Sequence, residues 1–188
     1  MSPSDPLPLR GRNPADAPPA GRRLVDGRVP VADYDVKWPY LFHREAGRIR
    51  QALGDSVLDL QHVGSTSVPG LTATPCVDLL LLVADPADED AYLPPLAGAG
   101  YTLVDRDPGG DGRRLFKGPD VNIDLHVLGA GSGEADRMLR FRDHLRTHPG
   151  DHELYASTKR GLAERRWESL QDYADAKSPV IDEIMSRS

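Results

Sequence analysis

The segment HVGSTSVPGL at residues 62–71 follows a β-rich run, Val57 to Val63, and breaks it with a glycine and a serine. Such a run predicts a strand that ends at Val63. Gly64 then permits a tight turn and a close approach of the backbone to a ligand. Ser65 adds a hydroxyl and a backbone N–H group at the start of the next segment, a position that suits phosphate oxygens. The segment therefore predicts a strand followed by a phosphate-binding turn.

A second strand is predicted from Cys76 to Val83, and it carries one acidic residue, Asp78. The run is otherwise apolar, so it is expected to lie centrally in a sheet. An unpaired carboxylate there would be costly, so Asp78 is expected to be paired, capped by donors or bound to a cation. A strand-borne carboxylate facing a phosphate turn is suited to holding Mg²⁺ against a nucleoside triphosphate. The alternative is an ordinary turn at Gly64 and Ser65, with Asp78 as a hydrogen-bonded core residue.

A third predicted strand, Val121 to Leu128, alternates polar and apolar side chains. Asn122, Asp124 and His126 share one of its faces. That face either meets solvent or uses Asp124 and His126 to ligate a metal or move a proton. If this strand adjoins that of Asp78, the two carboxylates can share one cation.

Six basic residues are candidate phosphate ligands. They are Arg113, Arg114 and Lys117 near a predicted strand, Arg142 and Arg146 on one predicted helix, and Lys159 on another. A triphosphate pocket needs several cations, and arginine grips phosphate with two hydrogen bonds. The alternative for each residue is a solvated surface charge.

The remaining patterns predict a mixed sheet followed by a helical C-terminal third. Apolar residues at helical spacing predict one helix ending at Gly54 and others over 87–99, from Glu134 to Pro149, over 152–167 and from Leu170 onwards. Strands are also predicted over 101–105 and 113–117. The second of these is joined to 121–128 by a hairpin at 118–120.

The chain has 188 residues, enough for one domain with its own core. Residues 1–28 are rich in Pro, Gly, Ala and Arg, so they are predicted to be a disordered tail that precedes a domain over 29–188. No apolar run approaches the ~20 residues of a membrane span, so no membrane association is expected. The N-terminus lacks the apolar core of a signal peptide, and a cytoplasmic location is the expectation.

The net charge of −6 argues against a general nucleic-acid binder and leaves room for a small phosphate-bearing ligand. The single cysteine, Cys76, excludes an intramolecular disulfide and a thiolate metal cluster. It is expected to be a small buried hydrophobe, with a reactive thiol as the alternative.

Taken together, these segments resemble the GrpB family (UPF0157) over residues 31–184. The matching positions are Tyr34, Trp38 and Phe42; residues 62–71; Pro75 with Val77-Asp78-Leu79; Gly100-Tyr101; Leu115-Phe116-Lys117; Leu125-His126-Val127; residues 141–146; Tyr155-Ala156 with Lys159; and Tyr173 with Lys177.

The resemblance implies an α/β (α+β) fold of the nucleotidyltransferase type. In that superfold a Gly-Ser turn precedes a strand with an Asp-x-Asp or Asp-x-Glu pair, and a later strand gives a third carboxylate. By position, Gly64 and Ser65 match the turn, Asp78 matches the first carboxylate and Asp124 is a candidate third. The second position is Leu80, which cannot bind a metal. The chain also departs from the family's usual lysine at 74 and its usual histidine at 124.

Two functions follow from the resemblance and the residues together. The first is a nucleotidyltransferase that transfers a nucleoside monophosphate from a triphosphate to a small-molecule acceptor. Mg²⁺ would sit on Asp78 and Asp124, and His126 would join them as a catalytic residue. The expected nucleotide-binding residues are His62, Gly64, Ser65, Thr66, Lys117, Arg142 and Lys159.

The second function is a non-catalytic accessory domain that binds a nucleotide or another small ligand at a degenerate metal site. Leu80 supports this function. The resemblance also implies that domains of this family are fused to dephospho-coenzyme A kinase in some bacteria, which fits an accessory role. A lyase or group transferase that uses His62, Asp124 and His126 without a metal is a third option. The sequence does not specify the acceptor, the base or the oligomeric state.

Overall fold

A computed structural model describes residues 26–107, 109–120 and 122–188. The predicted tail falls mostly on residues 1–25, which lie outside the described residues. At the start of the described chain, the N–H group of Trp167 donates to the carbonyl of Gly27 at 2.8 Å, and Val29 is buried. The chain is therefore packed against the domain from Gly27 onwards.

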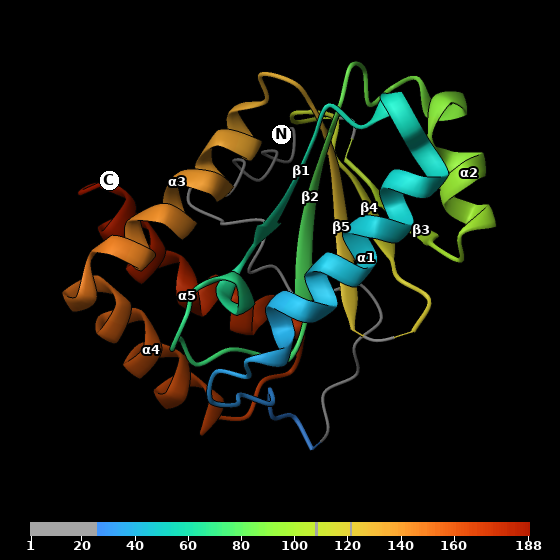
Figure 1. The fold of residues 1–188 in the computed structure, drawn as a ribbon. Coiled ribbons are helices and arrows are strands. Elements are labelled where there is room, and N and C mark those ends of the chain that lie inside the picture. Colours follow the sequence, from blue (N-terminus) through green and yellow to red (C-terminus); the bar gives the residue numbers. More distant parts are fainter. Residues whose placement is uncertain (1–25, 108, 121) are drawn as a thin grey trace, which may run out of the picture.

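The described residues form one five-stranded mixed sheet in the order β1-β2-β5-β4-β3 (Figure 1). Strands β2 and β5 are parallel, and the other neighbouring pairs are antiparallel. The bounds are β1 Asp59–Val63, β2 Val77–Val83, β3 Thr102–Arg106, β4 Arg114–Lys117 and β5 Ile123–Gly129. The mixed sheet and the β4–β5 hairpin are confirmed. The middle strand is β5, and the apolar β2 is its neighbour, paired on both sides.

Helices cover both faces of this sheet (Figure 1). Their bounds are α1 Lys37–Leu53, α2 Leu93–Gly98, α3 Gly133–Thr147, α4 Pro149–Ala163 and α5 Leu170–Met185, with short 3-10 turns η2 Gly54–Ser56, η3 Ser65–Ser67 and η4 Glu89–Ala91. Helices α1 and α2 pack on one face, and α3 packs on the other. Helices α4 and α5 pack with α3 and the segment after η3, which confirms the helical C-terminal third.

The alternation of side chains along β2 explains the two layers. Leu79 and Leu81 face α1, where Ala46 and Ile49 meet them in the largest apolar cluster. Residues at the intervening positions face α3, and Leu80 packs there. Because successive side chains on a strand point to opposite faces, Asp78 belongs to the α3 face of the sheet.

Three predicted helix boundaries were wrong. The helix expected to end at residue 167 ends at Ala163, and prolines explain the other two differences. The helix expected over 87–99 is reduced to η4 and the short α2, because Pro94 and Pro95 are tolerated only in a first turn and prevent an earlier start. Pro149 was expected to break a helix before the next one began near His152. It instead opens α4 directly after α3, with His148 as the residue between them.

No helix in the described part of the chain is both long enough and apolar enough to cross a membrane.

Candidate functional site

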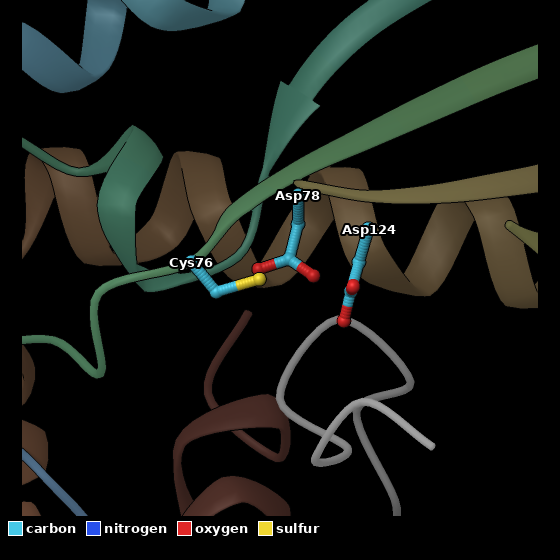
Figure 2. A group of neighbouring side chains, drawn as sticks. All are labelled: Cys76, Asp78 and Asp124. Carbon is cyan, nitrogen blue, oxygen red and sulfur yellow. The ribbon is translucent and has the colours of Figure 1, made fainter. Parts of the chain in front are cut away.

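Two carboxylates meet where β2 and β5 run side by side. The parallel register places Asp78 directly opposite Asp124. The two residues are only 6% and 1% exposed, and both side chains point toward the same space beside the sheet (Figure 2). Asp78 and Asp124 therefore form a buried pair on the α3 face, as required for the shared cation that the sequence suggested.

The turn after β1 lies directly against this pair. Gly64 has φ +70°, and a Cβ atom added to it would lie 2.5 Å from Oδ2 of Asp78. Only glycine combines this backbone conformation with so close an approach. Ser65 follows as the first residue of η3 and is half-buried, while the hydroxyl of Ser67 donates to the carbonyl of Gly64 at 2.5 Å. The close backbone approach predicted for Gly64 is thus made to the carboxylate of Asp78.

His126 and Lys117 complete the polar cluster. Nε2 of His126 lies 3.1 Å from Oδ1 of Asp78, and the ammonium group of Lys117 pairs with Asp124. Burial, with smaller contributions from Arg113 and Lys117, lowers the pKa of His126 to about 3. The ring is therefore neutral at pH 7 and orients Asp78 without neutralising it. The polar face of β5 is buried, so the alternative of a solvent-facing strand is wrong for Asp124 and His126.

Cys76 joins the carboxylates, and sequence reasoning missed it as a site residue. It is buried, as expected for a small hydrophobe, but its sulfur is directed at Asp78 (Figure 2). Sγ of Cys76 and one oxygen each of Asp78 and Asp124 all lie within 4.8 Å of one another. The signal in the sequence was the Cys76-x-Asp78 spacing, because residues two apart on an extended chain share a face. Three potential anionic donors at this separation fit a divalent cation.

His62 and Thr66 lie away from this cluster. Pairing of β1 with β2 sets Val63 opposite Asp78 and His62 opposite Leu79, so His62 faces α1. Its ring stacks on Phe42 at a centroid distance of 5.0 Å, and its Nε2 is 3.0 Å from the Thr66 hydroxyl. Burial, with smaller contributions from Arg146, Arg142 and His43, lowers the pKa of His62 to about 3. The structure therefore places these two residues behind the turn, on the opposite side of the sheet from the carboxylates.

Arg142 forms hydrogen bonds with residues at the end of β1. Its Nη1 donates to the His62 carbonyl and to Oε1 of Gln61, both at 3.0 Å. One helical turn later, Arg146 donates to the carbonyl of Ser67 at 2.7 Å. Two arginines of α3 thus hold the segment that contains Gly64 and Ser65.

Two lysines of the C-terminal helices are buried beside tyrosine rings. Nζ of Lys159 on α4 is 4.5 Å from the centre of the Tyr155 ring, and Nζ of Lys177 on α5 is 4.9 Å from that of Tyr173. Lys159 was a predicted phosphate ligand, and the alternative of a solvated surface charge is wrong for it, since it is 1% exposed. Lys177 was not predicted as a site residue.

Leu80 occupies the position of the second carboxylate and is fully buried. It packs with Val63, Leu128 and Met138 between the sheet and α3. The site is therefore apolar on the side where a second strand-borne acid would stand, and its cation-binding groups are confined to the end of the strands nearest Gly64.

Comparisons with known proteins give one consistent result. The family model described as GrpB protein matches residues 28–187. A UPF0157 protein of Halalkalibacterium halodurans is 53% identical over 160 residues, which cover 85% of this chain and 82% of that protein. A second, from Streptomyces coelicolor, is 44% identical over 160 residues and covers 85% and 84%. The crystal structure of the conserved protein GrpB from Enterococcus faecalis superimposes with a TM-score of 0.75 at 31% identity, covering 84% of this chain and 96% of that one.

A more distant match has a different length. A dephospho-CoA kinase of Mycolicibacterium paratuberculosis is 26% identical over 193 residues, which cover 89% of this chain but only 47% of the kinase. The chain therefore spans about half the length of that protein.

Proposed function

This chain belongs to the GrpB family, and from that premise we propose that it is a nucleotidyltransferase. It would use a divalent cation to bind a nucleoside triphosphate and transfer the nucleoside monophosphate to a hydroxyl of a small molecule. The observation that carries the proposal is the in-register pair of Asp78 and Asp124, set against the turn at Gly64.

The carboxylate pair supplies the charge that this chemistry needs. Two carboxylates on neighbouring strands can hold one divalent cation, which would neutralise triphosphate oxygens and polarise the α-phosphoryl group. A site whose protein ligands are only oxygen atoms favours Mg²⁺ in this role. The buried position lowers the local dielectric constant and strengthens the interaction between the cation and its ligands.

The remaining residues have roles that follow from their positions. The backbone of Gly64 and the hydroxyl of Ser65 would bind the β- and γ-phosphates. Asp124 accepts the proton of the acceptor hydroxyl while the acceptor oxygen bonds to the α-phosphorus. The bond from that phosphorus to the bridging oxygen breaks, and diphosphate leaves. His126, neutral and hydrogen-bonded to Asp78, acts as a positioning residue.

One observation favours a second function. Leu80 is sealed in an apolar cluster, so the second carboxylate of the superfold's usual arrangement is absent at that position. A site with fewer ligands can hold a nucleotide or another phosphate-bearing molecule without turning it over. In that case the domain is an accessory module, and the half-length match to dephospho-CoA kinase is consistent with a domain that also stands beside another catalytic unit.

Thermal unfolding tests the binding step. A ligand that binds only the folded state at about 100 times its Kd stabilises it by about 2.7 kcal/mol, or about 5–11 °C for a domain of this size. We expect Mg²⁺ with at least one of the four ribonucleoside triphosphates to produce such a shift. Asp78→Asn should abolish the shift, whereas Asp136→Asn, at an exposed position of α3, should preserve it.

Turnover separates the two functions. Release of diphosphate in the presence of small hydroxyl acceptors, lost in Asp78→Asn and Asp124→Asn, supports the transferase. A thermal shift without diphosphate release supports the accessory module. If none of the four nucleotides shifts the melting temperature with any divalent cation, the transferase is wrong and the accessory module does not bind a nucleotide.

A further inference from the structure

We propose that Cys76 is a third ligand of the cation, and that the site takes a borderline transition-metal ion, with Zn²⁺ as the first candidate, in place of Mg²⁺. The proposal deepens the function above, because it rests on a cation between Asp78 and Asp124. It changes the identity of that cation and therefore what the site can bind.

The geometry comes from two adjacent strands and the residue that leads into one of them. Cys76 immediately precedes β2, and Asp78 is the second residue of that strand. Asp124 is the second residue of β5 and lies opposite Asp78. The three donor atoms converge from three different backbone positions within 4.8 Å of one another (Figure 2).

This separation suits a small tetrahedral ion. Zinc binds carboxylate oxygen at about 2.0–2.2 Å and thiolate sulfur at about 2.3 Å, so the ligands of a tetrahedral zinc ion lie about 3.3–3.7 Å apart. Donors that start within 4.8 Å of one another must therefore approach by up to about 1 Å, through side-chain rotation, to bind one ion. Three protein ligands leave a fourth position for water or a phosphate oxygen, as in catalytic zinc sites.

The donor chemistry sets the preference between metals. Mg²⁺ takes oxygen ligands in a near-octahedral arrangement and does not use sulfur. Thiolate favours zinc and other transition metals, and Co²⁺ and Zn²⁺ both accept mixed sulfur and oxygen ligands. The thiol of Cys76 releases its proton to solvent when the metal–sulfur bond forms, so the ligand set becomes one thiolate and two carboxylates.

Positively charged groups offset the negative charge of this ligand set. One thiolate and two carboxylates carry three negative charges. A divalent cation supplies two positive charges, and the ammonium of Lys117, paired with Asp124, supplies the third. Such a balance matters because an uncompensated charge is costly at a site where Cys76, Asp78 and Asp124 are all buried.

Absorption spectroscopy with Co²⁺ tests the proposal on the full chain after treatment with a chelator. Co²⁺ bound to thiolate has a near-ultraviolet charge-transfer band that Co²⁺ bound only to oxygen and nitrogen lacks. Because Cys76 is the single cysteine in the sequence, such a band can come only from this residue. We expect one equivalent of Co²⁺ to produce the band and Zn²⁺ to displace it, while Mg²⁺ in large excess does not.

Two variants locate the ion. Cys76→Ser is nearly isosteric and should lose the band and weaken Zn²⁺ binding at least about 10-fold, the lower end of what even indirect changes at metal sites cause. Asp78→Asn should also lose the band while keeping the thiol. Circular dichroism establishes that both variants are folded, and Asp136→Asn serves as the unchanged control.

The results distinguish this proposal from the function on which it rests. The band in the parent protein and its loss in both variants support the sulfur ligand. Co²⁺ binding without the band, or equal Zn²⁺ affinity in Cys76→Ser, overturns it, and a nucleotide-dependent thermal shift with Mg²⁺ would then leave the transferase intact. Zn²⁺ binding through Cys76 with no nucleotide-dependent shift supports the metal site and contradicts the transferase. If no divalent cation binds, both are wrong.

Discussion

Gly64 is required both by the backbone conformation of the turn and by its contact with the candidate site. Its positive φ is unfavourable for other residues, and its Cα atom lies against the carboxylate of Asp78. Both features serve one arrangement, in which the chain passes directly over the acid at the end of β1. A change at this residue should therefore alter stability and the position of Asp78 together.

We predict that Gly64→Ala lowers the free energy of unfolding by about 2–4 kcal/mol, because strain at positive φ costs about 1–3 kcal/mol and the new Cβ also displaces Asp78. Urea unfolding measures the change. Gly131→Ala is the matched control, since Gly131 has φ +83° but no atom within 4 Å of an added Cβ. Equal losses in the two variants would show that contact with Asp78 contributes nothing.

Tyr101 and Tyr92 offer a second comparison between single residues. The hydroxyl of Tyr101 donates to Oε2 of the fully buried Glu45 at 2.7 Å, whereas that of Tyr92 donates to the carbonyl of Pro86 at 2.5 Å. Hydrogen bonds to charged groups contribute about 1.5–3 kcal/mol and those between neutral groups about 0.5–1.5 kcal/mol. We predict that Tyr101→Phe destabilises the protein more than Tyr92→Phe in urea unfolding. The opposite order would show that the hydrogen bond to Glu45 contributes less than the one to the Pro86 carbonyl.

At the scale of the elements, α3 holds the turn in place. Its apolar side packs on the sheet through Met138, while Arg142 and Arg146 reach the carbonyls of His62 and Ser67. One helix thus fixes both the strand that ends at the site and the turn that follows it. The arginines predicted from the sequence as phosphate ligands therefore have a structural task in the protein alone.

We predict that Arg142→Ala lowers the free energy of unfolding by about 1–3 kcal/mol, because two carbonyl-type acceptors at the end of β1 lose their donor. Arg140→Ala, at an exposed position on the same helix, should change it by no more than about 0.5 kcal/mol. Chemical denaturation of both variants measures the difference. A loss in Arg140→Ala as large as that in Arg142→Ala would indicate a general effect on α3.

At the scale of the whole molecule, two buried histidines on opposite faces of the sheet couple folding to pH. The pKa values of His62 and His126 are each lowered to about 3, mainly by burial. In the unfolded chain both titrate near pH 6.5. Between these values the unfolded state binds more protons, so the stability is fully present above about pH 6.5 and falls as the pH is lowered toward 3.

We predict that each histidine contributes up to about 1.4 kcal/mol per pH unit to this fall. His62→Gln should reduce the slope of the unfolding free energy against pH by up to about 1.4 kcal/mol per pH unit between about pH 4 and 6. This corresponds to the uptake of one proton. Thr66→Val removes the hydrogen-bond partner but retains His62, so it should lower the stability without reducing the slope. An unchanged slope in His62→Gln would show that His62 does not titrate in this way.

The sequence was most informative where a pattern is local. The strand that ends at Val63, the turn at Gly64 and the apolar strand of Asp78 each depend on neighbours within a few residues, and the structure contains all three. The sequence predicted that Asp78 and Asp124 share a cation only if their two strands are neighbours. Strand order depends on the whole sheet, so a local pattern could not decide this. The sequence did not predict that His62 faces away from the carboxylates or that Cys76 lies beside Asp78. Both depend on how the strands pair and where the side chains point.

The order of the strands has a consequence for the newly made chain. Strand β5 lies between β2 and β4, yet it is the last of the five to be synthesised. Until it arrives, the run VDLLLLV of β2 has one free edge along which another nascent chain can pair. Insertion of β5 closes that edge and, in the same event, brings Asp124 to Asp78. A protein interrupted before residue 123 is therefore expected to be both prone to aggregation and unable to bind a cation at this site.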